Sequence, residues 1–222
     1  MVNKPVIAIL GGTGKEGRGL AYRWAKAGYP IIIGSRAQER AQQAAEVIRE
    51  RVPQAQIQGM ENRAAAQTAD IVVVSVPYAG FRPLLEHIRD AVQGKVVVNV
   101  VVPLKPPKVT KVHLPPEGSA AQEAQAILGP EVAVVNAFQN IAHELLWKDG
   151  PIDCDVLVTG KGKANRQKVI ALVKDAGLRA WDAGPIENSA VVEGLTSVLI
   201  YLNKTYGSTH AGIRITGVPD GR

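Results

Sequence analysis

Short apolar runs alternate with segments of helical periodicity along most of the chain. The apolar runs predict strands over Pro5–Leu10, Pro30–Gly34, Asp70–Val76, Lys95–Val102, Val132–Val135 and Asp155–Thr159. The periodic segments predict helices over Lys15–Gly28, Ala37–Val52, Phe81–Gln93, Ala120–Leu128, Ala164–Ala176 and Asn188–Asn203. Because the valine-rich runs lack alternating polar residues, we expect strands that are covered on both faces.

The regular succession of strand and helix favours an α/β fold with a doubly wound parallel sheet. A chain of 222 residues is long enough for such a sheet and a sizeable core. We expect residues 1–182 to form the sheet domain. Residues 183–222 are expected to form a helical C-terminal segment.

A glycine-rich stretch, GGTGKEG, lies between the first predicted strand and the first predicted helix. Gly12, Gly14 and Gly17 have the G-x-G-x-x-G spacing of a Rossmann dinucleotide-binding loop. In that setting Gly12 makes the tight turn, Gly14 leaves room for a pyrophosphate, and Gly17 lets the helix pack closely on the strand. Free N–H groups at the helix start then face the phosphates. The sequence therefore predicts a Rossmann-type dinucleotide site.

A second reading of the same loop uses Gly11, Gly14 and Gly17 as G-x-x-G-x-x-G, which is typical of short-chain reductases. Those enzymes need a catalytic Tyr-x-x-x-Lys pair, and Tyr22 and Lys26 have that spacing. Both residues fall within the first predicted helix, directly after the phosphate loop. We therefore interpret their spacing as coincidental.

The end of the second predicted strand favours NADP(H) over NAD(H). NAD-specific sites place Asp or Glu at this point to bind the ribose 2′-hydroxyl. Here the sequence reads GSR, with Ser35 and Arg36 in the expected place and Arg40 one helical turn further on. Two guanidinium groups beside a hydroxyl suit a 2′-phosphate.

Composition narrows the class of ligand and the compartment. The formal net charge is +6, but the basic residues are dispersed and only 5% of residues are aromatic, which favours small anionic ligands over nucleic acid. No apolar run approaches the roughly 18 residues of a membrane span, so we expect no membrane contact. Cys154 is the only cysteine, which fits a reducing compartment, and we expect a cytoplasmic protein.

The sequence offers no motif for covalent or metal chemistry. It lacks G-x-S-x-G and H-E-x-x-H, and its four histidines stand far apart, at positions 87, 113, 143 and 210. We therefore predict no metal site and no catalytic side chain. Hydride transfer between two bound rings is compatible with this prediction, because it depends on proximity and orientation and its chemistry resides in the cofactors.

Four stretches, GGTGKEG, GSR, VSVPY and WDAGPIENSAVVEGLTSVLIYLN, resemble the NADPH-dependent reductases of the deazaflavin coenzyme F420. The resemblance runs from Pro5 to about Thr216. It implies hydride transfer between NADP(H) and coenzyme F420, and a homodimer. The last predicted helix independently favours a dimer contact, because Val191–Leu202 is apolar on more than one helical face.

The resemblance also implies roles for individual residues. The pyrophosphate would be bordered by Gly12, Thr13, Gly14, Lys15, Glu16 and Gly17, and the 2′-phosphate by Ser35, Arg36 and Arg40. The cofactor cleft would be lined by Val76, Pro77, Tyr78, Arg82 and Leu104, with further nucleotide contacts from His143 and Ala211. The substrate would be faced by Gln139, Asn140 and Ile141. Gln139 and Asn140 stand where His and Thr are common in the family.

Two other functions stay open at this point. The chain could be an NADPH-dependent reductase of another flavin or small acceptor, or a non-enzymatic NADP(H)-binding sensor. A sensor would bind NADP(H) without turnover. A carbonyl reductase would need a proton donor beside its substrate, and the sequence does not point to one.

Overall fold

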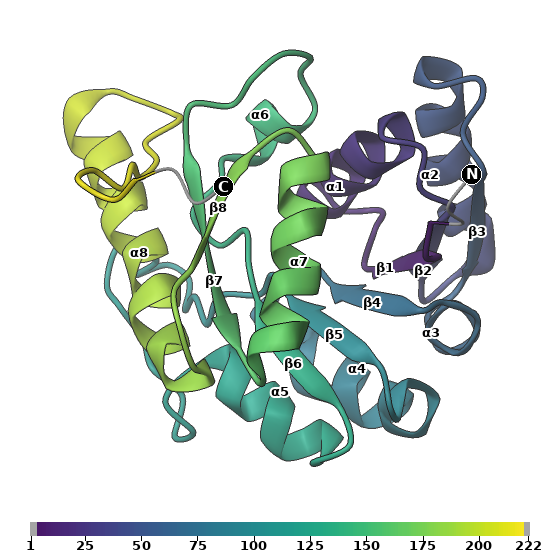
Figure 1. Cartoon of the computed structure of the whole chain (residues 1–222), viewed down its shortest axis with the longest axis horizontal. Helices are drawn as coiled ribbons and strands as arrows, with labels where there is room; N and C mark the ends of the chain where they lie inside the picture. Colours follow the sequence, from purple (N-terminus) through teal and green to yellow (C-terminus); the bar gives the residue numbers. More distant parts are fainter. Residues whose placement is uncertain (1–3, 220–222) are drawn as a thin grey trace.

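Eight strands form one sheet in the order β3-β2-β1-β4-β5-β6-β7-β8 in the computed structural model, which describes residues 4–219 (Figure 1). The strands are β1 (Ile7–Leu10), β2 (Ile31–Ser35), β3 (Ile57–Glu61), β4 (Ile71–Val74), β5 (Val96–Asn99), β6 (Ala133–Asn136), β7 (Asp155–Gly160) and β8 (Arg179–Asp182). The α-helices are α1 (Lys15–Lys26), α2 (Gln38–Arg51), α3 (Asn62–Thr68), α4 (Phe81–Ile88), α5 (Ala120–Leu128), α6 (His143–Leu146), α7 (Lys163–Asp175) and α8 (Ser189–Tyr206). The 3-10 turns are η1 (Tyr78–Gly80), η2 (Arg89–Val92) and η3 (Ile186–Asn188).

The central strands are apolar throughout because both faces of the sheet are covered. In β1, Ile7 and Ile9 belong to a core cluster shared with α1, α2 and α7, whereas Ala8 and Leu10 belong to a second cluster shared with α3, α4 and α5. Figure 1 shows these helices on the two sides of the sheet. This arrangement confirms the predicted doubly wound α/β fold.

One strand pairing departs from the parallel arrangement. Strands β3 to β6 pair in parallel, but β7 runs antiparallel to β6, with Val135 opposite Gly160 and Asn136 opposite Thr159. The connection between β6 and β7 includes one α-helix, the four-residue α6. It enters β7 at the same edge of the sheet at which it leaves β6. A parallel pairing would need a crossover to the other edge.

Four short elements did not emerge from the sequence pattern: β3, α3, α6 and β8. Their apolar signals are weak. Only Ile57 is buried in β3, whose sequence is IQGME, and no residue is buried in β8, whose sequence is RAWD. The helix predicted over Phe81–Gln93 exists as α4 followed by the 3-10 turn η2.

Helix α8 lies at the β8 side of the molecule, beside α5 and β7 (Figure 1). The buried carboxylate of Glu193 on α8 accepts hydrogen bonds from the backbone N–H groups of Ala120 (2.7 Å) and Ala121 (3.0 Å), at the start of α5. Burial raises the pKa of Glu193 to about 8, although these two hydrogen bonds act in the opposite direction. The division predicted between residues 182 and 183 falls in the loop after β8, and it stays a prediction.

The chain after α8 returns to the sheet. Ile213 accepts a hydrogen bond from the backbone N–H of Asp155 on β7 (2.8 Å), and the buried Asp155 side chain accepts one from Ile215 N–H (2.8 Å). The returning segment is therefore fixed beside β7. None of the helices within residues 4–219 is both long and apolar enough to span a bilayer.

Candidate functional site

The glycine loop joins β1 to α1 and leaves the start of the helix open. Gly11 has a positive φ of 75°, and a Cβ atom there would lie 2.4 Å from the carbonyl oxygen of Ser75. A Cβ atom on Gly17 would lie 2.8 Å from the Cα atom of Gly12, so this glycine permits the close approach of helix and loop. Gly14 is exposed and gives α1 no side-chain cap. The first-turn amides of α1 are thus available to an anionic group.

The end of β2 presents two unpaired guanidinium groups. Ser35 is buried at the end of the strand, while Arg36 and Arg40 are exposed. Neither guanidinium group makes a hydrogen bond or ion pair with any other residue from 4 to 219. Glu61, the register partner of Ser35 on β3, accepts a hydrogen bond from Arg63 N–H (2.9 Å) at the start of α3. Arg36 and Arg40 are therefore free for a charged ligand.

A cavity of about 610 Å³ opens at the carboxyl ends of β1, β4, β5 and β6. It brings together these residues proposed from the sequence: Glu16, Val76, Pro77, Tyr78, Leu104, Gln139, Asn140, Ile141, His143 and Ala211. The carboxyl edge is where ligands bind in open α/β sheets. Gly12, Thr13, Gly14 and Lys15 directly precede the cavity residue Glu16 but do not line the cavity themselves.

Arg82 takes a different place from the one inferred from the family. Its Nη2 atom lies 2.8 Å from Oε1 of the buried Glu123 and 3.2 Å from Oε1 of Glu117, and it is absent from the cavity wall. The Tyr78 hydroxyl donates to Oε2 of Glu123 (2.8 Å). Burial and this hydrogen bond raise the pKa of Tyr78. Tyr78 therefore presents a fixed neutral ring at the cavity, and Arg82 holds the same glutamate from outside.

The segment after β6 enters the site through an unusual backbone conformation at Phe138. Phe138 is buried with a positive φ of 74°, a conformation that costs a non-glycine residue about 1–3 kcal/mol. Its ring packs edge-on against Trp24 of α1, with centroids 5.6 Å apart. This turn directs Gln139, Asn140 and Ile141 along the cavity wall.

Gln139 and Asn140 are buried, and the amide nitrogen of each is bound within the protein. Gln139 Nε2 donates to Asn99 O (2.7 Å) and to Asn136 Oδ1 (2.6 Å), and Asn140 Nδ2 donates to Val192 O (3.1 Å). Their amide oxygens, Oε1 and Oδ1, have no hydrogen-bond partner among the described residues. Both side chains are thus fixed in orientation with an acceptor left over.

Several cavity residues were not identified from the sequence. They are Ala79 after β4, Val100, Val102, Pro106 and Val109 after β5, Phe138, Ala142 and Glu144 after β6, Thr196, Leu199, Ile200 and Asn203 on α8, and Thr209 in the returning segment. Thr196 donates from its hydroxyl to Gln139 O (2.8 Å), which joins α8 to the wall formed after β6. The residues on α8 lie within the stretch that resembles the family, and this was the one signal that could have pointed to them.

Tyr22 and Lys26, the pair with short-chain-reductase spacing, do not line the cavity. The Tyr22 hydroxyl donates to Asp149 Oδ1 (2.5 Å), and Lys26 pairs with the same carboxylate. Both residues therefore connect α1 to the loop after α6. Their interpretation as a coincidental match agrees with this placement.

Comparisons with known proteins agree along nearly the whole chain. The family described as "NADP oxidoreductase coenzyme F420-dependent" matches residues 6–103. An F420-dependent NADP reductase from Methanocaldococcus jannaschii is 43% identical, over 96% of this chain and 98% of the relative. A protein of the same name from Methanothermobacter thermautotrophicus is 40% identical, over 96% of each chain.

Solved structures of other proteins share the α/β fold of this chain. A crystal structure from Arthrobacter sp. FB24, named as a candidate F420-dependent NADP reductase, superposes with a TM-score of 0.81 at 26% identity, covering 96% of this chain and 99% of that one. A Plasmodium falciparum pyrroline carboxylate reductase with NADP bound shares the fold at a TM-score of 0.59 and 14% identity, covering 93% and 68%. The relatives that match nearly the full length show that the chain belongs to the family of F420-dependent NADP reductases.

Proposed function

We propose that this chain transfers hydride between NADP(H) and coenzyme F420, as the names of its relatives imply. The observation that supports this most directly is the cavity at the carboxyl edge, which meets the open first turn of α1 at Glu16. The unpaired Arg36 and Arg40 fit a 2′-phosphate. Gln139 and Asn140 line the cavity and are held in place by hydrogen bonds within the protein, which gives the bound rings a fixed wall.

When both substrates are bound, the dihydronicotinamide would supply the hydride, the deazaflavin ring would accept it, and a proton from solvent would complete the reduction. The chain's own contribution is binding, orientation and exclusion of water. Val76, Pro77, Leu104 and Ile141 give the cavity an apolar lining. Gln139 and Asn140 are held by the hydrogen bonds of their amide nitrogens, so this part of the cavity wall is fixed before the substrates arrive.

The proposed activity is tested by mixing the protein with NADPH and oxidised F420 and following the visible absorption band of F420. We expect loss of the band with one NADPH consumed for each F420 reduced. Binding of NADPH without reduction of F420 or of a flavin would support the sensor hypothesis. Reduction of a flavin but not of F420 would support the alternative acceptor.

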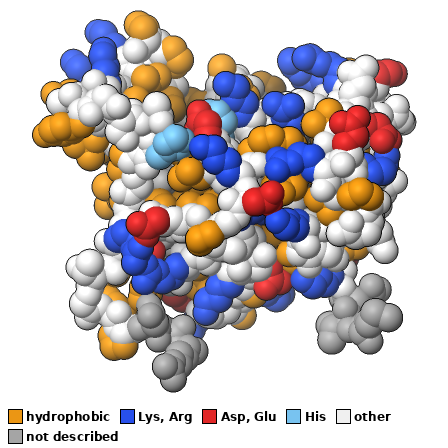
Figure 2. Space-filling view, turned by 90° about the horizontal axis from the view of Figure 1, so that it is seen from above, with side chains coloured by type: hydrophobic (Ala, Val, Ile, Leu, Met, Phe, Trp, Pro, Cys, Tyr) orange, Lys and Arg blue, Asp and Glu red, His pale blue; other side chains and the backbone are white. Residues whose placement is uncertain are grey.

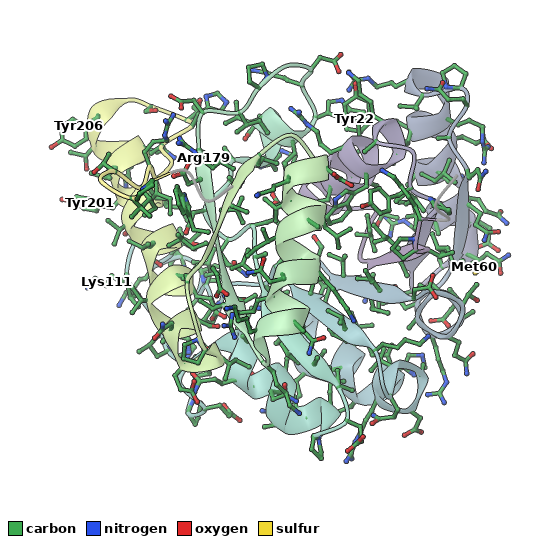
Figure 3. All side chains as sticks on the ribbon, viewed as in Figure 1. Tyr22, Met60, Lys111, Arg179, Tyr201 and Tyr206 are labelled. Atoms are coloured by element: carbon green, nitrogen blue, oxygen red, sulfur yellow. The ribbon has the colours of Figure 1, made fainter. Side chains whose placement is uncertain are left out.

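We further propose that the protein acts as a homodimer through α8. Val191, Val198, Tyr201, Leu202 and Tyr206 are exposed on this helix, with exposed fractions of 37–78%. Tyr201 and Tyr206 project away from the rest of the molecule in Figure 3. Exposed apolar side chains grouped on one helix favour a protein contact.

Light scattering at micromolar concentration is expected to give twice the mass of one chain. Tyr201→Glu should shift the protein toward the monomer, because the new charge would be buried in the contact. Val47→Glu, at another exposed valine on α2, is the matched control and should leave the mass unchanged. A wild-type protein that scatters as a monomer would rule out the dimer.

We also propose that the partners are small molecules and that the protein is cytoplasmic. Lys and Arg side chains are interspersed with Asp and Glu on the face shown in Figure 2, which supports small-molecule partners over nucleic acid. The thiol of Cys154 is free and buried. A free thiol supports a reducing compartment such as the cytoplasm.

A further inference from the structure

Glu16 is an acid with a buried carboxyl oxygen at the point where a dinucleotide phosphate is expected. It lies in the first turn of α1, two residues after Gly14, and it lines the cavity. The residue as a whole is partly exposed, but its Oε1 atom is sealed from solvent. That atom has no hydrogen-bond partner among residues 4–219. A buried carboxyl oxygen without a partner needs a physical explanation.

Helix α6 packs against α1, the helix that carries this carboxyl group. Gly19 of α1 permits the close packing, because a Cβ atom there would lie 2.6 Å from Leu146 Cβ. Glu144 of α6 faces Glu16 and repels its charge. His143 Nε2 lies 3.1 Å from Glu144 Oε1, so the imidazole is engaged with Glu144.

The other charged and titratable groups near Glu16 are in contact with other residues or exposed to solvent. The Tyr78 hydroxyl, across the cavity, is bound to Glu123. On α1 itself, Lys15 is exposed, and the guanidinium of Arg18 lies 5.8 Å from the ring centroid of Trp147. No cation within residues 4–219 forms an ion pair with Glu16. Burial, with a smaller effect of Glu144, raises the pKa of Glu16 to about 8.

We propose that Glu16 couples NADP(H) binding to the uptake of a proton, an inference that rests on the proposed function of this cavity. The ionised carboxylate would stand in the same helical turn as the bound pyrophosphate and oppose it. The neutral acid removes that repulsion. Binding therefore selects the protonated form of Glu16.

The test measures the affinity for NADP⁺ by calorimetry between about pH 7 and about pH 9, where the 2′-phosphate stays ionised because its second pKa is about 6. We expect the wild-type affinity to fall by about tenfold over this range, as linkage to one group with a pKa of about 8 requires. Glu16→Gln keeps the size and cannot ionise, so its affinity should change by less than about twofold. Glu39→Gln, at the exposed acid in the first turn of α2, is the matched control and should retain the wild-type dependence.

The wild-type protein alone gives a second measurement. At about pH 8, the binding enthalpy should depend on the buffer's ionisation enthalpy with a slope near half a proton taken up per site. A slope of zero would overturn the inference even if Glu16→Gln did not fold, and equal pH dependence in wild type and Glu16→Gln would do the same. Failure to bind NADP⁺ at any pH would instead overturn the proposed function, and this inference with it.

Discussion

Replacing Arg36 with alanine is expected to raise the dissociation constant for NADPH by about tenfold to a hundredfold and to change that for NADH by about twofold or less. A hydrogen bond to a charged group contributes about 1.5–3 kcal/mol, and each 1.4 kcal/mol is a factor of ten. Only NADPH has the 2′-phosphate that Arg36 would bind. The guanidinium forms no hydrogen bond or ion pair within the described part of the chain, so its removal should not disturb the fold.

The measurement is a titration of both nucleotides with wild type, Arg36→Ala and Arg40→Ala. Arg40 lies a turn further into α2, and its removal should have the same selectivity with a smaller effect. Arg63→Ala removes the same charge from α3, where the side chain bonds to His87 O (2.6 Å), and should leave both affinities unchanged. Equal losses for NADPH and NADH in Arg36→Ala would contradict the assignment of the 2′-phosphate site.

The parts of the site that the sequence revealed are those whose function depends on adjacent residues. The glycine loop lies between an apolar run and a helix, and Arg36 follows the second strand, so spacing alone was sufficient to propose them as a nucleotide site. The close packing at Gly17 is local in the same sense, since it is set by the backbone of Gly12, five residues earlier.

The parts that the sequence did not reveal depend on contacts between distant segments. Thr196 reaches the cavity because α8 packs beside the segment after β6, where its hydroxyl binds Gln139 O. Arg82 is drawn away from the cavity by Glu117 and Glu123, which lie beyond a long loop. No periodicity near Arg82 indicates that pairing. The antiparallel course of β7 likewise depends on how α6 returns the chain to the sheet.

Arg23 is the residue whose loss is expected to destabilise the fold most among the side chains around the site. It is buried in α1, and its guanidinium donates four hydrogen bonds to carbonyl oxygens at the end of α6 and beyond it. They run from Nε to Leu146 (3.0 Å), from Nη1 to Gly150 (2.9 Å), and from Nη2 to Leu145 (2.9 Å) and Lys148 (2.5 Å). These bonds hold the helix that places His143 and Glu144 in the cavity wall.

Arg23→Met should lower the free energy of unfolding by about 3 kcal/mol or more, because each buried group left without a partner costs about 1–3 kcal/mol. Urea denaturation measures the loss. Arg51→Met is the control, since Arg51 also bonds to this loop, at Trp147 O (2.7 Å), but from an exposed position, and it should cost less than about 1 kcal/mol. Arg23→Lys keeps the charge but offers three donors from one atom, so it should recover only part of the loss. If Arg23→Met and Arg51→Met were equally stable, the four carbonyl contacts could not be what fixes α6 against α1.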